Sequence, residues 1–348
     1  MTTTISPRAL TLAASIGWQH AAADPVRALL LAWRVLPAPL RGWLRLAGPY
    51  GRAAVLWGAG ERDAALASLS GSPRRLAAFA LAADQPAAAA AALDRLPDTD
   101  PARPVLAARL AWREGRPTDA LRALDHAPGR TARRLRATLT AEQSLLTSPP
   151  RARSMIVASS GQIAPVSGHD HEVGRGGRSA QAAPHIPGRV LHLVTDALPT
   201  TSAGYTIRTH EIALAQREAG LDPHVATRAG YPVTQGRIDG RRLVVLDGVP
   251  YHRLLPWRMP GRADTLARQS LELADALTRQ LQPAVLHAAS NYGNAKLALA
   301  LRERYGLPVV YEVRGFWEDT WLSRHPDGAK LAASELYQRN RALETRCM

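Results

Sequence analysis

The chain has almost no cysteine, few aromatic residues and no long apolar segment, and each scarcity excludes a class of protein. Its 348 residues contain a single cysteine, Cys347, and only 5% are aromatic. One thiol excludes an internal disulfide framework, so we expect a reducing, cytoplasmic location. Residues 22–46 are apolar but interrupted by charges and prolines, unlike the roughly 20 uninterrupted apolar residues of a membrane-spanning helix. The opening MTTTISPRAL lacks the charged start and apolar run of a signal peptide.

Lysine is also nearly absent, although the chain is strongly basic. Only Lys296 and Lys330 occur, so the formal net charge of +15 comes almost entirely from arginine. One interpretation is a coding bias toward GC-rich codons, which would give the charge no functional meaning. The other is attraction to a polyanion such as a nucleotide diphosphate or a membrane surface. No nucleic-acid-binding motif accompanies the charge, so we expect no nucleic acid among the partners.

Composition and pattern divide the chain into three parts. The 46% hydrophobic and 21% charged residues are typical of a soluble globular protein, and 348 residues exceed one ordinary domain. Residues 1–146 are rich in Ala, Leu and Arg without β-branched runs, which predicts an all-α domain. Within it, residues 26–35 are an amphipathic segment that either packs in the core or lies on a membrane surface. Residues 147–188 are predicted to be a flexible linker, and residues 189–348 alternate strand and helix patterns.

The helical part contains a degenerate repeat. Residues 57–69 and 112–124 share a Trp, a Gly and three apolar residues at the same offsets, and residues 81–93 match in part. Each unit predicts two helices joined by a turn, with Pro86 and Pro117 in the first turn of the second helix. The pattern resembles a tetratricopeptide-like array with irregular spacing. It predicts either a scaffold for a protein partner or a helical appendage that packs on its own enzyme.

Two motifs in the predicted linker resemble binding sites but lack the surroundings that such sites need. His169, Asp170 and His171 are metal-ligating residue types, yet adjacent residues point in different directions and no distant residue completes a ligand set. The glycines at 174, 176 and 177 imitate a phosphate-binding loop, but no strand precedes them. We therefore expect neither a metal site nor a nucleotide-binding loop in this segment.

The third part predicts a parallel sheet with helices on both faces. Predicted strands cover residues 189–195, 223–228, 241–246, 251–255, 284–289 and 307–313, and predicted helices cover residues 205–219, 264–281, 291–305 and a stretch from about 329 onward. Apolar strands that alternate with helices are typical of a Rossmann-like α/β fold. Ligands of such sheets bind beyond the carboxyl ends of the strands, which is where the polar residues of this sequence gather.

Two of the loops that follow predicted strands contain candidates for anion binding and catalysis. The first loop starts at Asp196 and passes through Gly204 into a helix, where free N–H groups and the helix dipole favour an anionic ligand. The alternative is an ordinary connecting loop. The second loop follows His287, which is either a buried structural histidine or a functional one at a strand end.

The third loop, residues 312–321, combines charged and aromatic side chains. Glu312 would be costly if it were buried alone, so Arg314 is its expected partner, or else a clamp for a phosphate or a sugar hydroxyl. Trp317 and Trp321 offer flat faces on which sugars stack. The alternative is a structural ion pair beneath a hydrophobic lid.

Together these segments resemble the N-terminal domain of glycosyltransferase family 4 enzymes with the GT-B fold, especially those of bacterial envelope and exopolysaccharide synthesis. The resemblance covers residues 189–348 and rests on Ser-Ala-Gly-Tyr (202–205), Arg-Thr-His-Glu (208–211), Leu-His-Ala-Ala-Ser (286–290) and Val-Tyr-Glu-Val-Arg-Gly-Phe-Trp-Glu-Asp (310–319). It implies retaining transfer of a sugar from a sugar nucleotide to a hydroxyl of a glycan or lipid-linked acceptor, without a further cofactor or a metal. Together with the basic charge, such an acceptor would suit a cytoplasmic protein that is peripheral at the inner face of the membrane.

The resemblance also implies roles for individual residues. Gly204 takes the position of the glycine loop that approaches the donor phosphates, and His287 lies in the strand where many relatives carry an active-site histidine. Those relatives often read His-x-His-Ser, whereas Ala289 stands at the position of the second histidine here. The remaining residues expected to line the binding site are Tyr205, Arg208, His210, Asn294, Glu312, Arg314 and Glu318.

The resemblance does not extend to the half that holds the sugar nucleotide in this family. Neither the Arg/Lys pair nor the glutamate motif of that half is present, and the sequence stops at Met348 inside a predicted helix. We therefore expect the chain alone to have little or no transferase activity. The alternative is a non-catalytic interaction or sugar-binding protein with a helical scaffold. A nucleotide-dependent oxidoreductase is disfavoured, because the three-glycine fingerprint and its following acidic residue are absent.

Overall fold

The structure of the chain, a computed structural model, describes residues 4–147, 185–325 and 328–348. The linker motifs at residues 169–171 and 174–177 lie outside the described residues. The described residues form two compact units. The helical unit comprises residues 14–143, 324–325 and 328–338, and the α/β unit comprises residues 4–13, 144–147, 185–323 and 339–348.

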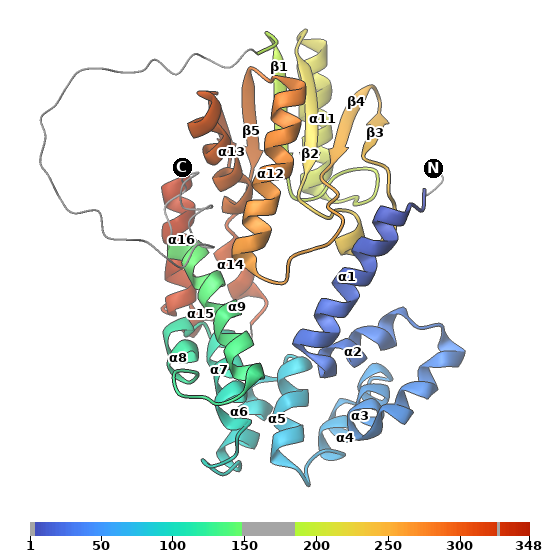
Figure 1. Ribbon diagram of the computed structural model, residues 1–348, viewed down its shortest axis with the longest axis vertical. Helices are drawn as coiled ribbons and strands as arrows, with labels where there is room; N and C mark the ends of the chain where they lie inside the picture. Colours follow the sequence, from blue (N-terminus) through green and yellow to red (C-terminus); the bar gives the residue numbers. More distant parts are fainter. Residues whose placement is uncertain (1–3, 148–184, 326–327) are drawn as a thin grey trace, which may run out of the picture. The chain divides into compact units, whose positions relative to one another are not determined.

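Short helices build the helical unit (Figure 1). They are α2 (Pro25–Val35), the 3₁₀ helix η1 (Ala38–Ala47), α3 (Gly48–Gly58), α4 (Arg62–Ala67), α5 (Pro73–Ala82), α6 (Pro86–Asp94), α7 (Arg103–Arg113), α8 (Pro117–Arg122) and the short α15 (Gly328–Leu331). Three further helices contribute residues to both units: α1 (Pro7–Ala23), α9 (Arg130–Thr147) and α16 (Glu335–Cys347). The prediction that the N-terminal part is helical is therefore confirmed.

Local sequence explains where several of these helices begin and how closely they pack. Proline occupies the first position of α2, α5, α6 and α8, where its missing N–H has no intrahelical partner to lose. Pro86 and Pro117 thus lie where the sequence predicts them. Alanines such as Ala77, Ala80 and Ala89 are fully buried between α5 and α6, and small side chains let the helix backbones approach closely. The tetratricopeptide-like repeat stays a prediction.

The helices of the described residues are too short or too polar to cross a membrane. The segment 26–35, an alternative membrane-surface element in the sequence, is the helix α2. Its Val26 is buried with Ala53, Ala54 and Phe79. Core packing therefore accounts for at least one face of this helix.

The α/β unit contains a six-stranded sheet. Its strands are β1 (Arg189–Val194), β2 (Asp222–Thr227), β3 (Leu243–Leu246), β4 (Val249–Arg253), β5 (Val285–Ala289) and β6 (Val309–Glu312), in the order β3-β4-β2-β1-β5-β6. Every neighbouring pair is parallel except β3 and β4, which form an antiparallel hairpin. The Asp247–Gly248 turn between them has positive φ at both residues, as a two-residue hairpin requires.

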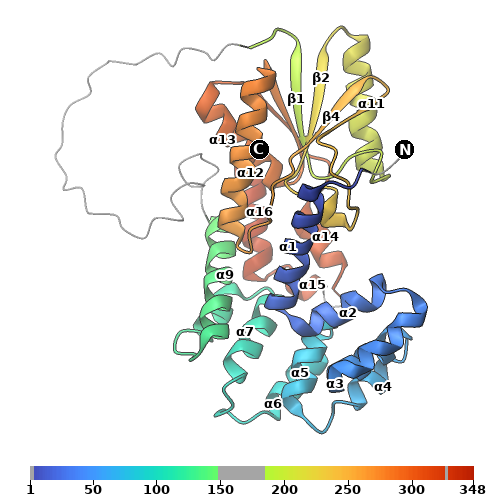
Figure 2. The same cartoon turned by 45° about the vertical axis from the view of Figure 1, so that its right-hand side comes forward.

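Helices cover both faces of this sheet, as the sequence predicts. Leu191, Leu193 and Leu286 point toward one face and pack with residues of α12 (Ala263–Leu281) and α13 (Tyr292–Tyr305). Val194 and Val225 point toward the other face and pack with Ala213 of α11 (Gly204–Glu218). Figure 2 shows α12 and α13 on one side of the strands and α11 on the other. The fold is therefore Rossmann-like, and it brings the carboxyl ends of β1, β5 and β6 to one edge.

The region after β6 differs from its prediction. The sequence suggests a loop followed by one helix from about residue 329, whereas α14 (Trp317–Ser323) forms within the expected loop and α15 precedes α16. Glu318 and Asp319 lie in the first turn of α14, where carboxylates stabilise the helix dipole. The aromatic residues of this segment therefore lie on and beside a helix.

Candidate functional site

One arginine ties together the three loops that the sequence singles out. Arg314 follows β6, and its Nη1 donates to the Tyr205 carbonyl oxygen at 2.8 Å and to Thr209 Oγ1 at 2.7 Å in α11. Its backbone N–H donates to Ser290 Oγ, just after β5, at 3.1 Å. The ends of β5 and β6 and the first turns of α11 are therefore fixed to one another through this residue.

Glu312 is the centre of charge at this edge of the sheet. Its Oε2 accepts a hydrogen bond from Arg314 Nη2 at 2.6 Å and lies 3.2 Å from His287 Nε2, while its Oε1 lies 2.7 Å from Arg208 Nε. Burial alone would raise the pKa of Glu312, but Arg314, His287 and Arg208 together hold that pKa below its ordinary value. The carboxylate is therefore ionised at neutral pH.

Arg314 and Arg208 differ in what they can offer a ligand. The Arg314 side chain is only 9% exposed and its guanidinium already meets Glu312, Tyr205 and Thr209, so the structure favours the ion-pair interpretation over the ligand-clamp interpretation. The Arg208 side chain is 60% exposed beside the same carboxylate. Arg208 is therefore the cation at this edge that can turn toward an incoming anion.

His287 is neutral and oriented. It lies opposite His192 in the β1–β5 register, and the two ring centroids are 4.5 Å apart. Burial lowers the pKa of His287 despite the neighbouring Glu312, and burial also lowers the pKa of His192 to about 4, helped by His287. Because a carboxylate only accepts, His287 Nε2 carries the proton toward Glu312, which leaves Nδ1 with the lone pair. This tautomer can accept a proton or a hydrogen bond through Nδ1.

The start of α11 is open to solvent and free of backbone constraints. Gly204 has no positive φ, and a Cβ added there would meet nothing within 4 Å. Thr206 Oγ1 accepts from the Ala203 N–H at 2.9 Å, whereas among the described residues the N–H groups of Gly204 and Tyr205 have no hydrogen-bond partner. A 15-residue helix with free N–H groups at an open start favours an anionic group there.

Tyr205 sits beside that start. Its hydroxyl donates to Asp196 Oδ2 at 3.1 Å, and the residue is 44% exposed. Asp196 lies at the end of β1 and also receives Gln235 Nε2 at 3.2 Å and the Arg228 guanidinium at 3.1 Å. Burial and the Asp196 carboxylate both raise the pKa of the Tyr205 phenol, so its hydroxyl stays protonated.

Exposed aromatic rings follow β6. Phe316 is 46% and Trp317 is 48% exposed. Trp317 stacks on Tyr292 at the start of α13, with ring centroids 6.1 Å apart. A half-exposed indole held flat by a second ring has one face free for an apolar sugar surface.

Three of the expected site residues make contacts within the framework of the fold. His210 bonds the Tyr251 hydroxyl at 2.8 Å and Asp247 at 2.9 Å, so both of its nitrogens join α11 to the β3–β4 hairpin. Asn294 donates to Thr195 Oγ1 and to the Ala289 carbonyl oxygen, which joins the ends of β1 and β5.

Glu318 is the third residue. It is buried, and electrostatically it acts on Tyr311 and on Glu344 of α16. Tyr311 alternates with Glu312 along β6 and therefore faces the opposite side of the sheet. The three residues thus support the framework, and within the described ranges no hydrogen bond or ion pair joins their side chains to Arg208, His287, Glu312 or Arg314.

Several residues that complete this edge of the sheet escape sequence reasoning. Thr209 and Ser290 hold Arg314, His192 stacks on His287, and Asp196 holds Tyr205. Thr209 lies four residues after Tyr205, so helical spacing could have grouped them. His192 could have been found only with the strand register, because it is 95 positions from His287.

Two cavities of the described residues belong to the helical unit, and their linings contain no residue of this edge. No group of three or more His, Cys, Asp or Glu side chains in the described ranges is arranged to hold a metal ion.

The comparisons with known proteins agree with this architecture. Residues 203–347 match the family described as Glycosyl transferase 4-like domain, which supports a glycosyltransferase family 4 domain in this part of the chain. The match begins at the residue before Gly204 and includes α11, β5, β6 and their loops. No curated protein and no solved structure matches the chain.

Proposed function

We propose that the chain, whose residues 203–347 match the Glycosyl transferase 4-like domain family, supplies the acceptor side of a retaining glycosyltransferase. In this proposal a sugar moves from a sugar nucleotide to a hydroxyl of an envelope glycan or glycolipid. The observation that carries the proposal is the cluster of Arg208, His287, Glu312 and Arg314 at the carboxyl ends of β5 and β6, beside the start of α11. Ligands of parallel sheets bind at such an edge.

Each member of the cluster has a distinct task in this proposal. Arg314 positions the loops, Arg208 attracts the anionic or hydroxyl-rich ligand, and Glu312 holds Arg208 and His287 in place. His287 Nδ1 receives a hydrogen bond or a proton from the reacting hydroxyl. The donor phosphates lie against the free N–H groups at Gly204 and Tyr205, where the positive end of the α11 dipole offsets their charge.

Binding of oligosaccharides to the full chain tests the acceptor role. Saturation-transfer NMR with a panel of hexose oligosaccharides is expected to show contact with wild-type protein. Arg208→Gln and Trp317→Ala are expected to weaken that contact severalfold, because they remove the exposed cation and the free ring face. Arg302→Gln, an exposed arginine of α13, serves as the matched control and should change nothing. A panel in which no saccharide contacts the protein would overturn the proposal.

Turnover of sugar nucleotides tests how much of the reaction this polypeptide performs alone. The described residues supply one sheet with an acceptor-type edge, while the resemblance assigns the base, ribose and diphosphate of the donor to a second Rossmann-like domain. We expect the 348-residue chain to transfer sugar slowly or not at all, since little then stabilises the leaving diphosphate. Rapid transfer by the 348-residue chain would instead show that it holds the donor unaided.

A specific surface favours peripheral membrane contact as a second element of the proposal. In η1, Leu40, Trp43 and Leu46 are 43%, 69% and 84% exposed. They are spaced by three residues, and a 3₁₀ helix has three residues per turn, so they share one face. Arg41 and Arg45 belong to the same helix. An apolar stripe with adjacent arginines is typical of a segment that lies in the interface of an anionic bilayer.

Flotation with phosphatidylglycerol vesicles tests this contact. Trp43→Ser with Leu46→Ser is expected to reduce the bound fraction by severalfold, whereas Trp18→Ser is the control because Trp18 is an equally exposed indole in α1. Equal losses in both proteins, or no binding of the wild type, would exclude η1 as a membrane-contacting element.

A further inference from the structure

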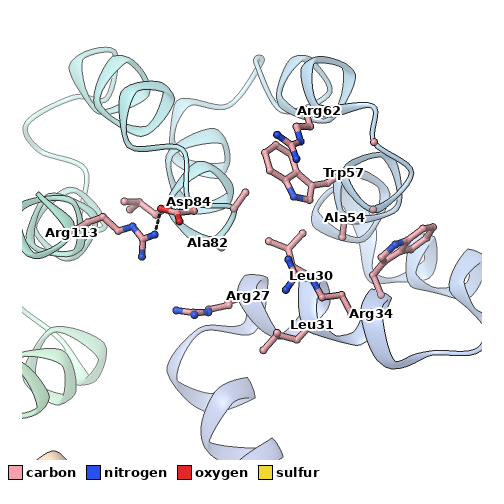
Figure 3. A pocket seen from close by; sticks show the side chains of 15 residues that line it. Arg27, Leu30, Leu31, Arg34, Ala54, Trp57, Arg62, Ala82, Asp84 and Arg113 are labelled. Carbon is pink, nitrogen blue, oxygen red and sulfur yellow. Dashed lines mark ion pairs between the residues drawn. The ribbon is translucent and has the colours of Figure 1, made fainter. Parts of the chain in front are cut away.

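The helical unit contains a cavity of about 560 Å³ that no part of the proposed transfer reaction uses. We name it the arginine cavity, and Figure 3 shows its walls. It is lined from α2, α3, α4, α7 and the end of α5 by Arg27, Leu30, Leu31, Trp33, Arg34, Ala54, Trp57, Gly58, Gly60, Arg62, Leu81, Ala82, Ala83, Asp84 and Arg113. The cavity is large enough for a small-molecule ligand.

The lining of this cavity has an excess of positive charge. Its lining holds four arginines and a single carboxylate, Asp84, which forms an ion pair with Arg113. Among the described residues no carboxylate lies within ion-pair distance of Arg27 or Arg34. Figure 3 shows Arg27 and Arg113 extending into the cavity from different helices. Like charges that share a lining repel one another, and a polyanion between them would relieve this repulsion.

Arg113 shows most clearly that the lining lacks hydrogen-bond acceptors for its arginines. Its Nε is buried and lacks a hydrogen-bond partner in the described part of the chain. Burial lowers the pKa of its guanidinium, and the neighbouring charge of Arg27 lowers it further. Its one partner, Asp84, has a positive φ of 62°, a conformation that few residues other than glycine adopt. A buried donor without an acceptor is costly, and an anionic ligand would supply the acceptor.

The rest of the lining is apolar. Leu30, Leu31 and Leu81 provide aliphatic surface, and Trp57 provides a ring that is covered on one side by the Arg62 guanidinium, 5.5 Å from its centroid. Gly58 lets Trp33 pack closely, because a Cβ there would lie 2.1 Å from the indole. The lining therefore suits a ligand that has a compact, multiply charged end and an uncharged organic part.

We propose that the arginine cavity binds an organic phosphate or diphosphate, with its phosphate between Arg27, Arg34 and Arg113 and its uncharged part against Leu30, Leu31 and Trp57. Guanidinium groups bind phosphate oxygens through paired N–H donors, and the excess of three cations over Asp84 matches a diphosphate better than a single carboxylate. The phosphate comes from a soluble nucleotide or from a lipid headgroup, and the same arginines recognise either.

Calorimetric titration of the full chain at low salt tests the proposal with three probes. Inorganic pyrophosphate reports the phosphate contacts alone, uridine diphosphate represents a nucleotide, and dihexanoyl phosphatidic acid below its micellar concentration represents a lipid headgroup. Arg27→Gln with Arg34→Gln is expected to weaken binding about tenfold or more, since a charge-assisted hydrogen bond is lost at each position. Arg52→Gln, an exposed arginine of α3 outside the lining, is the matched control.

The α/β unit is tested in parallel, because it also carries cations. Arg208→Gln should leave binding at the arginine cavity unchanged. Tighter binding of uridine diphosphate than of dihexanoyl phosphatidic acid assigns a nucleotide, and the reverse order assigns a lipid headgroup. The proposal is overturned if none of the probes binds, or if Arg208→Gln abolishes binding while the Arg27/Arg34 variant retains it. Circular dichroism of the variants confirms that the helices remain folded, and Arg113→Lys provides a second variant that keeps the charge but loses the paired donors.

Discussion

The two units of this chain differ in how their charged side chains are paired. In the α/β unit, several buried carboxylates are each paired with two arginines: Asp239 with Arg241 and Arg253, and Asp275 with Arg279 and Arg304. Glu312 has the same kind of neighbourhood. In the arginine cavity of the helical unit, Asp84 is the sole carboxylate among four arginines. Charge in the α/β unit is thus mostly structural, and charge in the helical cavity is not neutralised by the structure.

Their cores differ as well. The α/β core has large side chains such as Leu191, Leu286 and Tyr251 between a sheet and its helices. The helical core relies on alanines such as Ala77, Ala89 and Ala120 between short helices. Because dispersion and apolar burial grow with side-chain size, each helix pair in the helical unit gains less from burial. Substitutions that remove a charge and substitutions that change packing should therefore affect the stability of the two units differently.

The largest effect is expected from Arg314→Met in the α/β unit. The substitution leaves Glu312 largely buried without its principal partner and disconnects α11 from Ser290, so the free energy of unfolding should fall by about 2–4 kcal/mol. Urea denaturation followed by circular dichroism measures it. Arg208→Met removes the exposed partner of the same carboxylate and should cost less than about 1 kcal/mol. Similar losses in the two variants would contradict the structural role of Arg314.

A packing change in the helical unit should come next. Gly58→Ala would place a Cβ 2.1 Å from the Trp33 ring, so overpacking should lower the free energy of unfolding by about 1–3 kcal/mol. Gly17→Ala in α1 is the control: nothing lies within 4 Å of its added Cβ, and alanine should stabilise the helix by about 0.5–1 kcal/mol. Thermal unfolding of both variants measures these changes. A Gly58→Ala protein that is more stable than the wild type would refute the close packing of Gly58 against Trp33.

Acid should destabilise the α/β unit before its carboxylates titrate. Burial lowers the pKa of His192 and of His252 to about 4, below the value of about 6.5 in an unfolded chain. The unfolded state then binds more protons, so stability is complete above pH 6.5 and falls by about 1–3 kcal/mol as the pH drops toward 4. His192→Gln should flatten this dependence, whereas His20→Gln, at an exposed site of α1, should not. An unchanged slope in His192→Gln would contradict burial of a neutral imidazole.

The smallest change in stability is expected from Gly204→Ala. The glycine has no positive φ and its added Cβ meets nothing, so unfolding should change by less than about 0.5 kcal/mol. If donor phosphates approach the N–H groups of α11 as proposed, the methyl group would stand in their way, so binding of a sugar nucleotide should weaken. Scanning calorimetry of the variant measures its stability, and titration calorimetry measures its binding of the sugar nucleotide. Unchanged nucleotide binding would remove Gly204 from the site.

The sequence predicts the strands well because each is an apolar run that ends in polar residues. Predicted and observed bounds of β1, β2 and β5 differ by at most one residue at either end. The helix α14 is missed because it has only seven residues, too few to show a period. The pairing of Glu312 with Arg314 follows from the cost of burying a lone charge, and it is confirmed.

The sequence groups His210 and Glu318 with residues that they do not contact, and the two cases have a common cause. His210 is grouped with Gly204 and Arg208 because they are close in sequence, but on α11 it belongs to the buried face with Thr206 and Ala213. Glu318 is grouped with Arg314 although the intervening chain turns to the other face of the sheet. Proximity in sequence does not give direction in space. The arginine cavity lies beyond such reasoning, because its residues are spread from position 27 to 113.

The most direct measurement is backbone hydrogen exchange of the full chain with and without a millimolar hexose oligosaccharide, read by mass spectrometry. If the ends of β1, β5 and β6 form the carbohydrate site, the ligand should slow exchange at residues 203–209 and 312–317. Residues 27–34 and 113 report separately on the arginine cavity. Unaltered exchange at both α/β segments would contradict the central claim.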